Sequence, residues 1–378
     1  MEKAFTPRIR SFLNNYEKPC YVKESQEPSK IIVDCALGVN PFGCSPSVAA
    51  FLKSGDTALL DAFSHYPAYP YTSLRQAVSR YWMGTAAIGI DEIRVGLGSM
   101  AMIDMLCKCL VDPGSRVLGF VPQFPDFSAT VMSFGGVYET FPLDASRDYR
   151  LDVDGFCGAI TGEHRLVYMD NPNNPTGQVF PLEAIAKVAA RCRENGAVLM
   201  VDEAYADYID KSETAVALFP EFENLCVLRT FSKGFGLAGL RVGYAFLHEP
   251  LASCYDRVSY IFSVSTHGAA LAEQALLDEG FIKKSRESVS RIKGELLSLL
   301  TRLRVAHTHP EVPIFTLLAA SGLADDGVSL HSLLEKHGVK SEAGEDFENL
   351  GKHAVRLRVP KETEPLLSIL RDVERELR

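Results

Sequence analysis

One short stretch, RTFSKGFGLAGLRVGY at residues 229–244, combines a single amine with groups that can hold an anion. Lys233 supplies the amine, Thr230 and Ser232 supply hydroxyls, and Arg241 supplies a planar guanidinium suited to phosphate. The glycines of the stretch let a ligand approach the backbone closely. Because most lysines are solvated surface residues, the chemistry of this stretch depends on what lies near it.

Two other motifs supply a carboxylate and an amide. In VDEAYADY, residues 201–208, Asp202 ends an apolar run, where a carboxylate is costly unless it is solvated or paired with a cation. In MDNPNNPTGQ, residues 169–178, a tight turn presents Asn174, whose amide can both donate and accept. Taken singly, the first is compatible with a solvated strand end and the second with an ordinary loop.

The elements that must position these motifs are buried strands alternating with helices. LEAIAKVAARCRENG has the apolar spacing of a helix and ends at Gly196, so strand, helix and strand alternate as in a mostly parallel α/β sheet. Such sheets bind ligands outside the carboxyl ends of their strands, which is where the three motifs fall. The strands are predicted from continuous apolar runs at residues 117–121, 166–170, 197–205, 226–233 and 242–247.

The last third of the chain has a different pattern. Residues 263–306 have the pattern of long helices, and VPIFTLLAA, SLHSLLEKHG, AVRLRV and EPLLSILRDVEREL follow them. This order predicts a smaller α+β domain. Its final helix carries an apolar stripe of Leu366, Ile369, Leu370, Val373 and Leu377.

Composition excludes several classes of function. The 378 residues carry a formal net charge of −9, which argues against general nucleic-acid binding. No apolar stretch is long enough to span a membrane, and the N-terminal residues lack the apolar core of a signal peptide. The nine scattered cysteines form neither a disulfide framework nor a metal motif. We therefore expect a cytoplasmic protein that binds no metal, nucleic acid or membrane.

Together the motifs resemble the fold-type I pyridoxal-phosphate (PLP) enzymes, specifically the class I and II aminotransferases of the histidinol-phosphate aminotransferase group. The resemblance rests mainly on NPNNPTG, DEAY and SKGFGLAGLRVGY, and also on NPFGCSP, HYPAYPYTSLRQAV, GLGSMAMIDML and DPGSRVL. It implies an α/β transferase fold with three parts: an arm and part of the small domain at 1–48, a large PLP-binding domain at 49–262 and a small domain at 263–378.

The resemblance also implies catalytic roles. Lys233 would form the Schiff base with PLP and move the Cα proton. Asp202 would pair with the pyridine nitrogen, so that the ring accepts electrons. Tyr205 and Asn174 would hydrogen-bond the ring's phenolic oxygen. Phe124 lies where the family stacks an aromatic ring on the cofactor, most often a tyrosine.

Binding roles follow from the same resemblance. Ser99 and Met100, at the start of a helix, would hold the cofactor phosphate together with Thr230, Ser232 and Arg241. Tyr66 matches a tyrosine that reaches the phosphate in the neighbouring subunit, which implies a homodimer with shared active sites. Arg356 matches the arginine that binds the substrate α-carboxylate.

Three departures from the family concern the substrate. Gly38 stands where an asparagine is common, and Pro313 occupies the place of another asparagine. Ser341 replaces an arginine that helps bind a substrate phosphate, and Lys340 is the only cation near it. Acidic residues that would repel such a phosphate follow at 342, 345, 346 and 348.

Three reactions fit this pattern. The first is aminotransfer from an amino acid to a keto acid, with Gly38, Asn174 and Arg356 contacting the substrate. The second is elimination and ring closure on a cationic substrate related to arginine, as in the capreomycidine synthases, if the acidic run lines the pocket rather than facing water. The third is decarboxylation, as in the threonine-phosphate decarboxylases, which the missing arginine disfavours.

Overall fold

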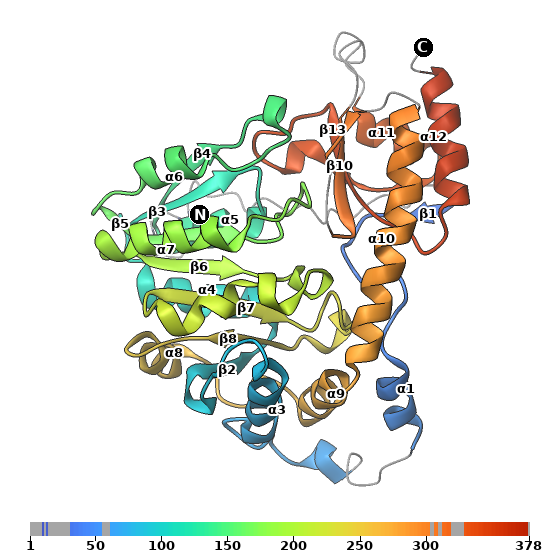
Figure 1. The fold of residues 1–378 in the computed structure, drawn as a ribbon. Helices are drawn as coiled ribbons and strands as arrows, with labels where there is room; N and C mark the ends of the chain where they lie inside the picture. Colours follow the sequence, from blue (N-terminus) through green and yellow to red (C-terminus); the bar gives the residue numbers. More distant parts are fainter. Residues whose placement is uncertain are drawn as a thin grey trace, which may run out of the picture.

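Two sheets of different size organise the chain. In the computed structural model, which describes residues 10, 13, 31–54, 61–302, 306–308, 312–318 and 329–376, a seven-stranded and a four-stranded sheet lie side by side (Figure 1). The larger sheet is mostly parallel, and the smaller one is antiparallel. The expected α/β class, with a smaller α+β part, is confirmed.

The larger sheet has the strand order β2-β8-β7-β6-β5-β3-β4. Its strands from β4 to β7 run parallel, whereas β8 is antiparallel to both of its neighbours. The five predicted apolar runs correspond to β3, β5, β6, β7 and β8. The bounds are β2 Ile93–Gly96, β3 Arg116–Val121, β4 Val137–Pro142, β5 His164–Asp170, β6 Val198–Asp202, β7 Leu225–Thr230 and β8 Gly243–Phe246.

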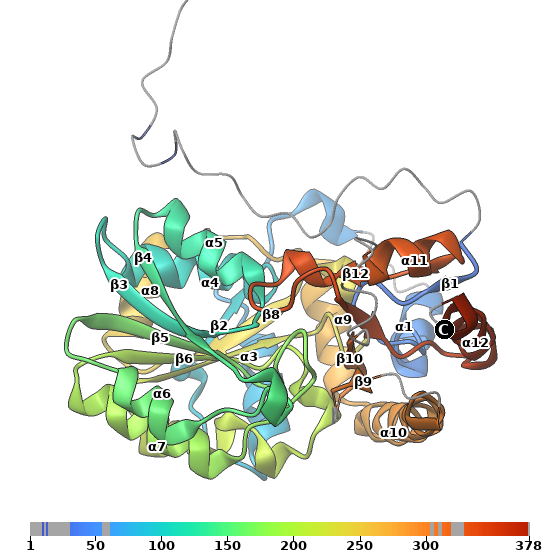
Figure 2. The same ribbon diagram turned by 90° about the horizontal axis from the view of Figure 1, so that it is seen from above.

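Helices cover both faces of this sheet (Figure 2). One face packs on α4 (Gly98–Leu110), α5 (Pro125–Ser133) and α8 (Leu251–Val258). Because successive strand residues point to opposite faces, Met200 of β6 joins this core while Leu199 and Val201 join the other. The opposite face packs on α3 (Thr72–Trp82), α6 (Val153–Ala159), α7 (Leu182–Glu194) and α9 (Thr266–Leu276).

The smaller sheet packs against three helices. Its order is β12-β13-β10-β9, and β1 (Val33–Asp34) pairs with β11 (Val339–Lys340) in a separate two-stranded sheet. The predicted stripe of α12 is buried from Leu366 to Val373, and Leu377 lies outside the described residues. The bounds are β9 Ala306–His307, β10 Ile314–Leu318, β12 Glu342–Ala343, β13 Ala354–Arg358, α10 Glu279–Arg302, α11 Leu330–Lys336 and α12 Glu364–Glu376.

Side chains of the smaller sheet hold the loop after β5. Thr308 Oγ1 donates to the carbonyl of Thr176 at 2.7 Å, and Thr316 Oγ1 donates to that of Pro175 at 3.1 Å. Both hydroxyls are fully buried, so these bonds fix the smaller sheet against the NPNNPTG loop.

The domain boundaries at 48 and 262 stay predictions. α1 (Pro46–Lys53) and α3 both pack on α9, and the long helix α10 leads from there to the smaller sheet (Figure 1). Among the described residues, no helix is long and apolar enough to cross a membrane.

Candidate active site

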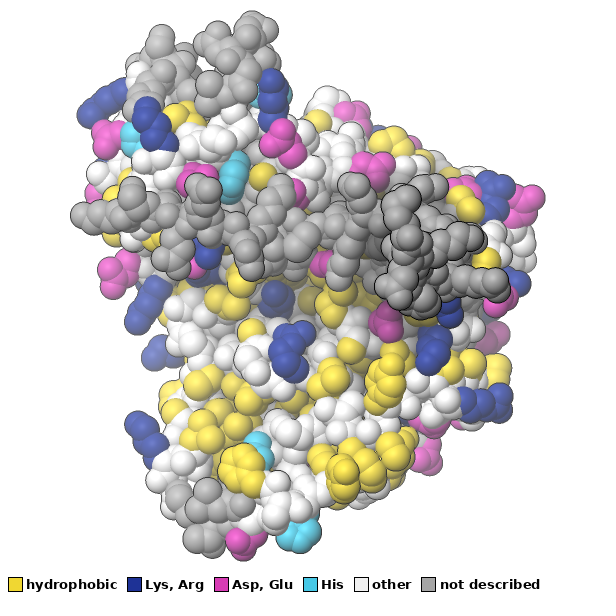
Figure 3. Space-filling view, turned by 180° about the vertical axis from the view of Figure 1, so that it is seen from behind, with side chains coloured by type: hydrophobic (Ala, Val, Ile, Leu, Met, Phe, Trp, Pro, Cys, Tyr) yellow, Lys and Arg dark blue, Asp and Glu magenta, His cyan; other side chains and the backbone are white. Residues whose placement is uncertain are grey.

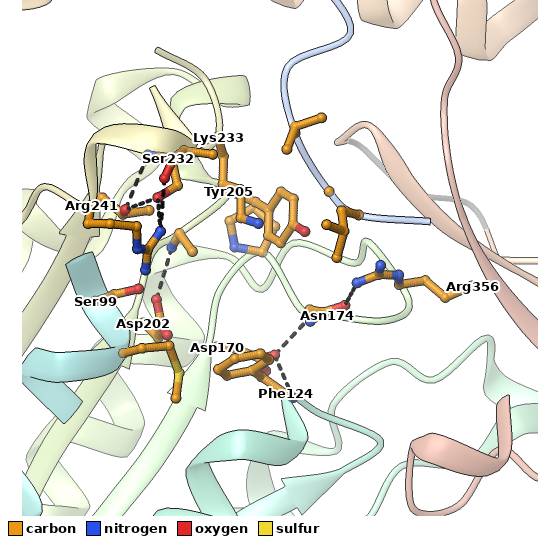
Figure 4. A pocket seen from close by; sticks show the side chains of 18 residues that line it. Ser99, Phe124, Asp170, Asn174, Asp202, Tyr205, Ser232, Lys233, Arg241 and Arg356 are labelled. Atoms are coloured by element: carbon orange, nitrogen blue, oxygen red, sulfur yellow. Dashed lines mark hydrogen bonds between the residues drawn. The ribbon is translucent and has the colours of Figure 1, made fainter. Parts of the chain in front are cut away.

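The sequence motifs meet in one cavity of about 220 Å³ between the two sheets. Three parallel strands, β5, β6 and β7, end at its floor, and the side chains that follow them point into it (Figure 4). The N-terminus of α4, the segment before α5, strand β13 and residues 37–39 complete the wall. The cavity contains every predicted site residue except Tyr66: Gly38, Ser99, Met100, Phe124, Asn174, Asp202, Tyr205, Thr230, Ser232, Lys233, Arg241 and Arg356.

Asp202 is a buried carboxylate at the end of β6. Its Oδ2 accepts from the hydroxyl of Tyr168 at 3.2 Å, and its Oδ1 accepts from the amide of Ala204 at 3.0 Å. Burial raises the pKa of Asp202 to about 6, while these hydrogen bonds and the charge of Lys233 act to lower it. A carboxylate held in this way can pair with a protonated nitrogen of a ligand.

Lys233 lies just after β7, on the wall of the cavity. Its Nζ is 5.3 Å from the centre of the Tyr205 ring. The next residue, Gly234, cannot carry a side chain, because a Cβ there would lie 2.2 Å from the Cβ of Asp207. Asn40 Nδ2 donates to the Gly234 carbonyl at 2.7 Å and helps to fix the backbone that carries the lysine.

Groups that could hold an anion lie at the end of the cavity near Arg241. Thr230 Oγ1 donates to Ser232 Oγ at 2.9 Å, and Arg241 Nη1 reaches the same oxygen at 3.5 Å. The first amides of α4, at Gly98 and Ser99, have no partner within the helix and favour an anion. Gly98 has a φ of 76°, and a Cβ there would lie 3.0 Å from Arg241 Nη2, so this close approach requires glycine.

The opposite end of the cavity holds Arg356. Its Nη1 donates to Asn174 Oδ1 at 3.0 Å, and its Nη2 donates to the Ala36 carbonyl. The Glu342 Oε1 atom is 3.6 Å from Nη2, because Glu342 of β12 is the cross-strand partner of Arg356. Burial raises the pKa of Glu342 to about 6, and the charge of Arg356 acts to lower it.

The acidic residues that follow Ser341 differ in their burial. Glu342 is buried against Arg356, whereas Glu345 and Glu348 are exposed. Ser341, at the place of the missing arginine, is buried, and its Oγ lies 2.9 Å from His331 Nδ1. Neither Ser341 nor Glu342 lines the cavity itself, so most of the run is a solvated segment.

Gly38 faces Tyr205. A Cβ at position 38 would lie 1.8 Å from the Tyr205 hydroxyl and 2.7 Å from the carbon that carries it. Tyr205 is 4% exposed and belongs to a buried hydrophobic cluster. The glycine is therefore explained by the packing of Tyr205, while its contact with substrate stays a prediction. Pro313, also singled out in the sequence, is buried directly before β10, and its carbonyl accepts from the Val359 amide at 2.7 Å.

Replacing Gly38 with alanine should displace Tyr205 and weaken cofactor binding. Overpacking of a closed site costs about 1–3 kcal/mol, so we expect the PLP dissociation constant to rise about 5- to 150-fold. Titration of the apoprotein with PLP measures it. Gly84→Ala is the matched control, because a Cβ there meets no atom within 4 Å. Equal affinities in both variants would contradict the packing role.

Tyr66 lies outside the cavity. It is 83% exposed and stacks on Phe262, with ring centres 4.9 Å apart. The described residues hold no group of three or more His, Cys, Asp or Glu side chains arranged for a metal ion.

Sequence reasoning missed Asp170, which lines the cavity at the end of β5. The signal that identified Asp202, an acid ending a buried apolar run, was also present at Asp170. The apolar lining of Leu37, Val39, Pro172, Ala204 and Ala238 had no such signal, because it comes from separate loops.

The residues of the cavity fit PLP. The hydroxyls, the guanidinium and the start of α4 suit its phosphate, the buried Asp202 suits a protonated ring nitrogen, and Lys233 supplies an amine between them. Each of these groups lines the same cavity, so one ligand of that size can reach them all.

Similar proteins support the same conclusion. A histidinol-phosphate aminotransferase of Ralstonia nicotianae is 32% identical over 82% of this chain and 79% of its own length. One of Methanococcus maripaludis is 28% identical over 92% and 91%. The crystal structure of the Sinorhizobium meliloti enzyme in complex with pyridoxal-5'-phosphate shares the fold, with a TM-score of 0.85 and 24% identity over 99% and 100% of the chains. The family described as aminotransferase class I and II matches residues 30–372. The chain therefore belongs to the class I and II aminotransferases and is a PLP-dependent transaminase.

Proposed function

We propose that the substrates are an α-amino carboxylic acid without a phosphate group and the matching 2-oxo acid. The observation that carries this proposal is that the single cavity places Arg356 at the opposite end from Arg241, with Lys233 between them (Figure 4). Arg241 is assigned to the phosphate of the cofactor and Arg356 to the α-carboxylate of the substrate.

The chain's own residues divide the work. PLP, when bound, supplies a carbonyl group for the amine and an electron-accepting ring. Asp202 would pair with the ring nitrogen, and Asn174 and Tyr205 would hold the phenolic oxygen. Lys233 would act as the base that takes the proton from the substrate Cα. Phe124 would cover one face of the ring.

The charges argue against a phosphate on the substrate side chain. The described lining of the cavity contains three cations, Lys233, Arg241 and Arg356, and each has an assigned partner. The buried Glu342 beside Arg356 would repel the phosphate dianion of such a substrate. The relatives named as histidinol-phosphate aminotransferases therefore support the reaction, while the negative charge behind Arg356 supports a different substrate.

The alternative reactions gain no comparable support. The relatives and the solved structure described above are aminotransferases. Most of the acidic residues at 342–348 face away from the cavity, so a cationic substrate would find few carboxylates to pair with. The cytoplasmic location stays a prediction.

The homodimer is part of the proposal. Exposed hydrophobic side chains gather on the rear face of the molecule (Figure 3), and exposed rings include Phe63, Tyr66, Tyr260 and Phe262. Aromatic side chains at such a surface are typical of subunit contacts. A second copy would cover them and bring its own Tyr66 to the phosphate end of the site. A mass in solution of one chain, 41.6 kDa, rather than two would contradict it.

A panel of amino donors tests the substrate. Mixing the PLP-loaded protein with each amino acid alone should remove the visible absorption of the cofactor, and a 2-oxo acid should restore it. Neutral and acidic amino acids should react at least about tenfold faster than histidinol phosphate. That compound has no α-carboxylate, and its phosphate dianion would have to share Arg356 with the buried Glu342, which weakens charged hydrogen bonds worth about 1.5–3 kcal/mol. Preferential reaction with histidinol phosphate, or consumption of arginine without a 2-oxo acid product, would overturn the proposal.

A further inference from the structure

Asp170 forms a second buried carboxylate beside Asp202. The two residues end neighbouring parallel strands, β5 and β6, and are paired in register. Asp170 is 3% exposed, and it lines the same cavity as Lys233. The roles assigned above to the cofactor-binding residues leave this carboxylate unexplained.

Three N–H groups donate to this carboxylate. Its Oδ2 accepts from the amide of Asn174 at 2.9 Å and from the amide of Phe124 at 3.2 Å (Figure 4). Its Oδ1 accepts from Asn173 Nδ2 at 2.9 Å. Because all three partners are donors, they favour the ionised carboxylate, which only accepts.

These bonds join two segments that line the cavity. Phe124 precedes α5 and supplies the aromatic face, whereas Asn174 belongs to the loop after β5. Asn174 in turn accepts from Arg356 Nη1 at 3.0 Å. The Asp170 carboxylate thus fixes the backbone at Phe124 and at Asn174. Through the side chain of Asn174 it also supports Arg356, the arginine assigned to the substrate carboxylate.

Opposing effects of the surroundings act on the pKa of Asp170. Burial raises the pKa of Asp170 to about 7, and the charge of Asp202 adds to the increase, while the bonds from Asn174, Asn173 and Phe124 lower it. Burial and the Asp170 charge also raise the pKa of Tyr138. The titratable and charged groups around Asp170 are Asp202 on β6, Tyr168 on β5, Tyr138 on β4, and Lys233, Arg241 and Arg356 in the cavity wall.

We propose that Asp170 is a positioning residue of the cofactor site: it fixes Phe124 and Asn174 against the ring and adds a second negative charge that favours the protonated forms of the bound cofactor. The inference rests on the PLP site and not on the identity of the substrate. It is therefore tested without substrate, by binding and spectra alone.

Two variants, each titrated over a range of pH, separate position from charge. Asp170→Asn keeps the shape and loses the charge, so the pH midpoint of the visible absorption should fall by about one unit, because a nearby anion had stabilised the proton. Its PLP dissociation constant should rise about tenfold, as expected for a lost charged hydrogen bond. Asp170→Glu keeps the charge but moves it, so the midpoint should change less while the circular dichroism of the bound cofactor decreases.

The controls are internal to the chain. Asp154→Asn changes an exposed carboxylate on α6 and should leave the midpoint and the dichroism unaltered. Thermal melting identifies a variant that has lost its fold. If one of the two Asp170 variants is unfolded, the spectra of the other variant test the proposal. Native midpoint and native dichroism in a folded Asp170→Asn protein would overturn the proposal.

Discussion

Replacing Lys233 with alanine is expected to abolish the visible absorption of bound PLP and to reduce aminotransfer by about 10²- to 10⁴-fold. Among the described residues that line the cavity, Lys233 is the only one with an amine. No neighbouring side chain can replace it, because the two other cations are guanidinium groups, which stay protonated at pH 8. Absorbance after reconstitution with PLP and single-turnover kinetics measure the two effects.

The control for this variant is Lys187→Ala. Lys187 lies on the outer surface of α7 and pairs with Asp154, so its loss should leave both the absorption and the rate unchanged. Retention of the visible band in Lys233→Ala would show that another group binds the aldehyde. A native protein that takes up no PLP would be incompatible with the cavity as described.

The predicted strands were confirmed where they are buried on both faces. The runs that became β3, β5, β6, β7 and β8 are apolar along nearly their whole length, and that pattern follows from helices on both sides. The edge strand β4 is half exposed, so it has no continuous apolar run and was not predicted. The antiparallel direction of β8 could not be predicted either, because burial produces the same composition in both directions.

The site was predictable where it depends on position along the chain. Asp202 ends β6, and Lys233 lies three residues after the end of the neighbouring strand β7, so the sheet itself brings them together. Glu342 and Gly38 depend on contacts between distant segments. Glu342 faces Arg356 only because β12 pairs with β13, and Gly38 is required only because the Tyr205 hydroxyl occupies the space of its Cβ. Neither contact can be predicted from the spacing of these residues in the sequence.

Arg356 is the residue whose replacement tests the substrate assignment most directly. Lysine would keep the charge but lose the planar fork that donates to Asn174 and Ala36 and can bind a carboxylate through two bonds. Loss of one charged hydrogen bond costs about 1.5–3 kcal/mol, so kcat/KM for an α-amino acid should fall about 10- to 150-fold in Arg356→Lys. The absorption of bound PLP should change little, since Arg356 lies at the far end of the cavity from Arg241.

A substrate without a carboxylate makes the test specific. The corresponding amine should react poorly with the native protein and equally poorly with Arg356→Lys, so that the preference for the acid disappears in the variant. Arg358→Lys is the matched control, because Arg358 is buried in the same strand but donates to the backbone carbonyls of Asp34, Leu37 and Val359. It should lower stability and keep the preference. An unchanged preference in Arg356→Lys would mean that another group binds the carboxylate, and the proposed orientation of the substrate would then be wrong.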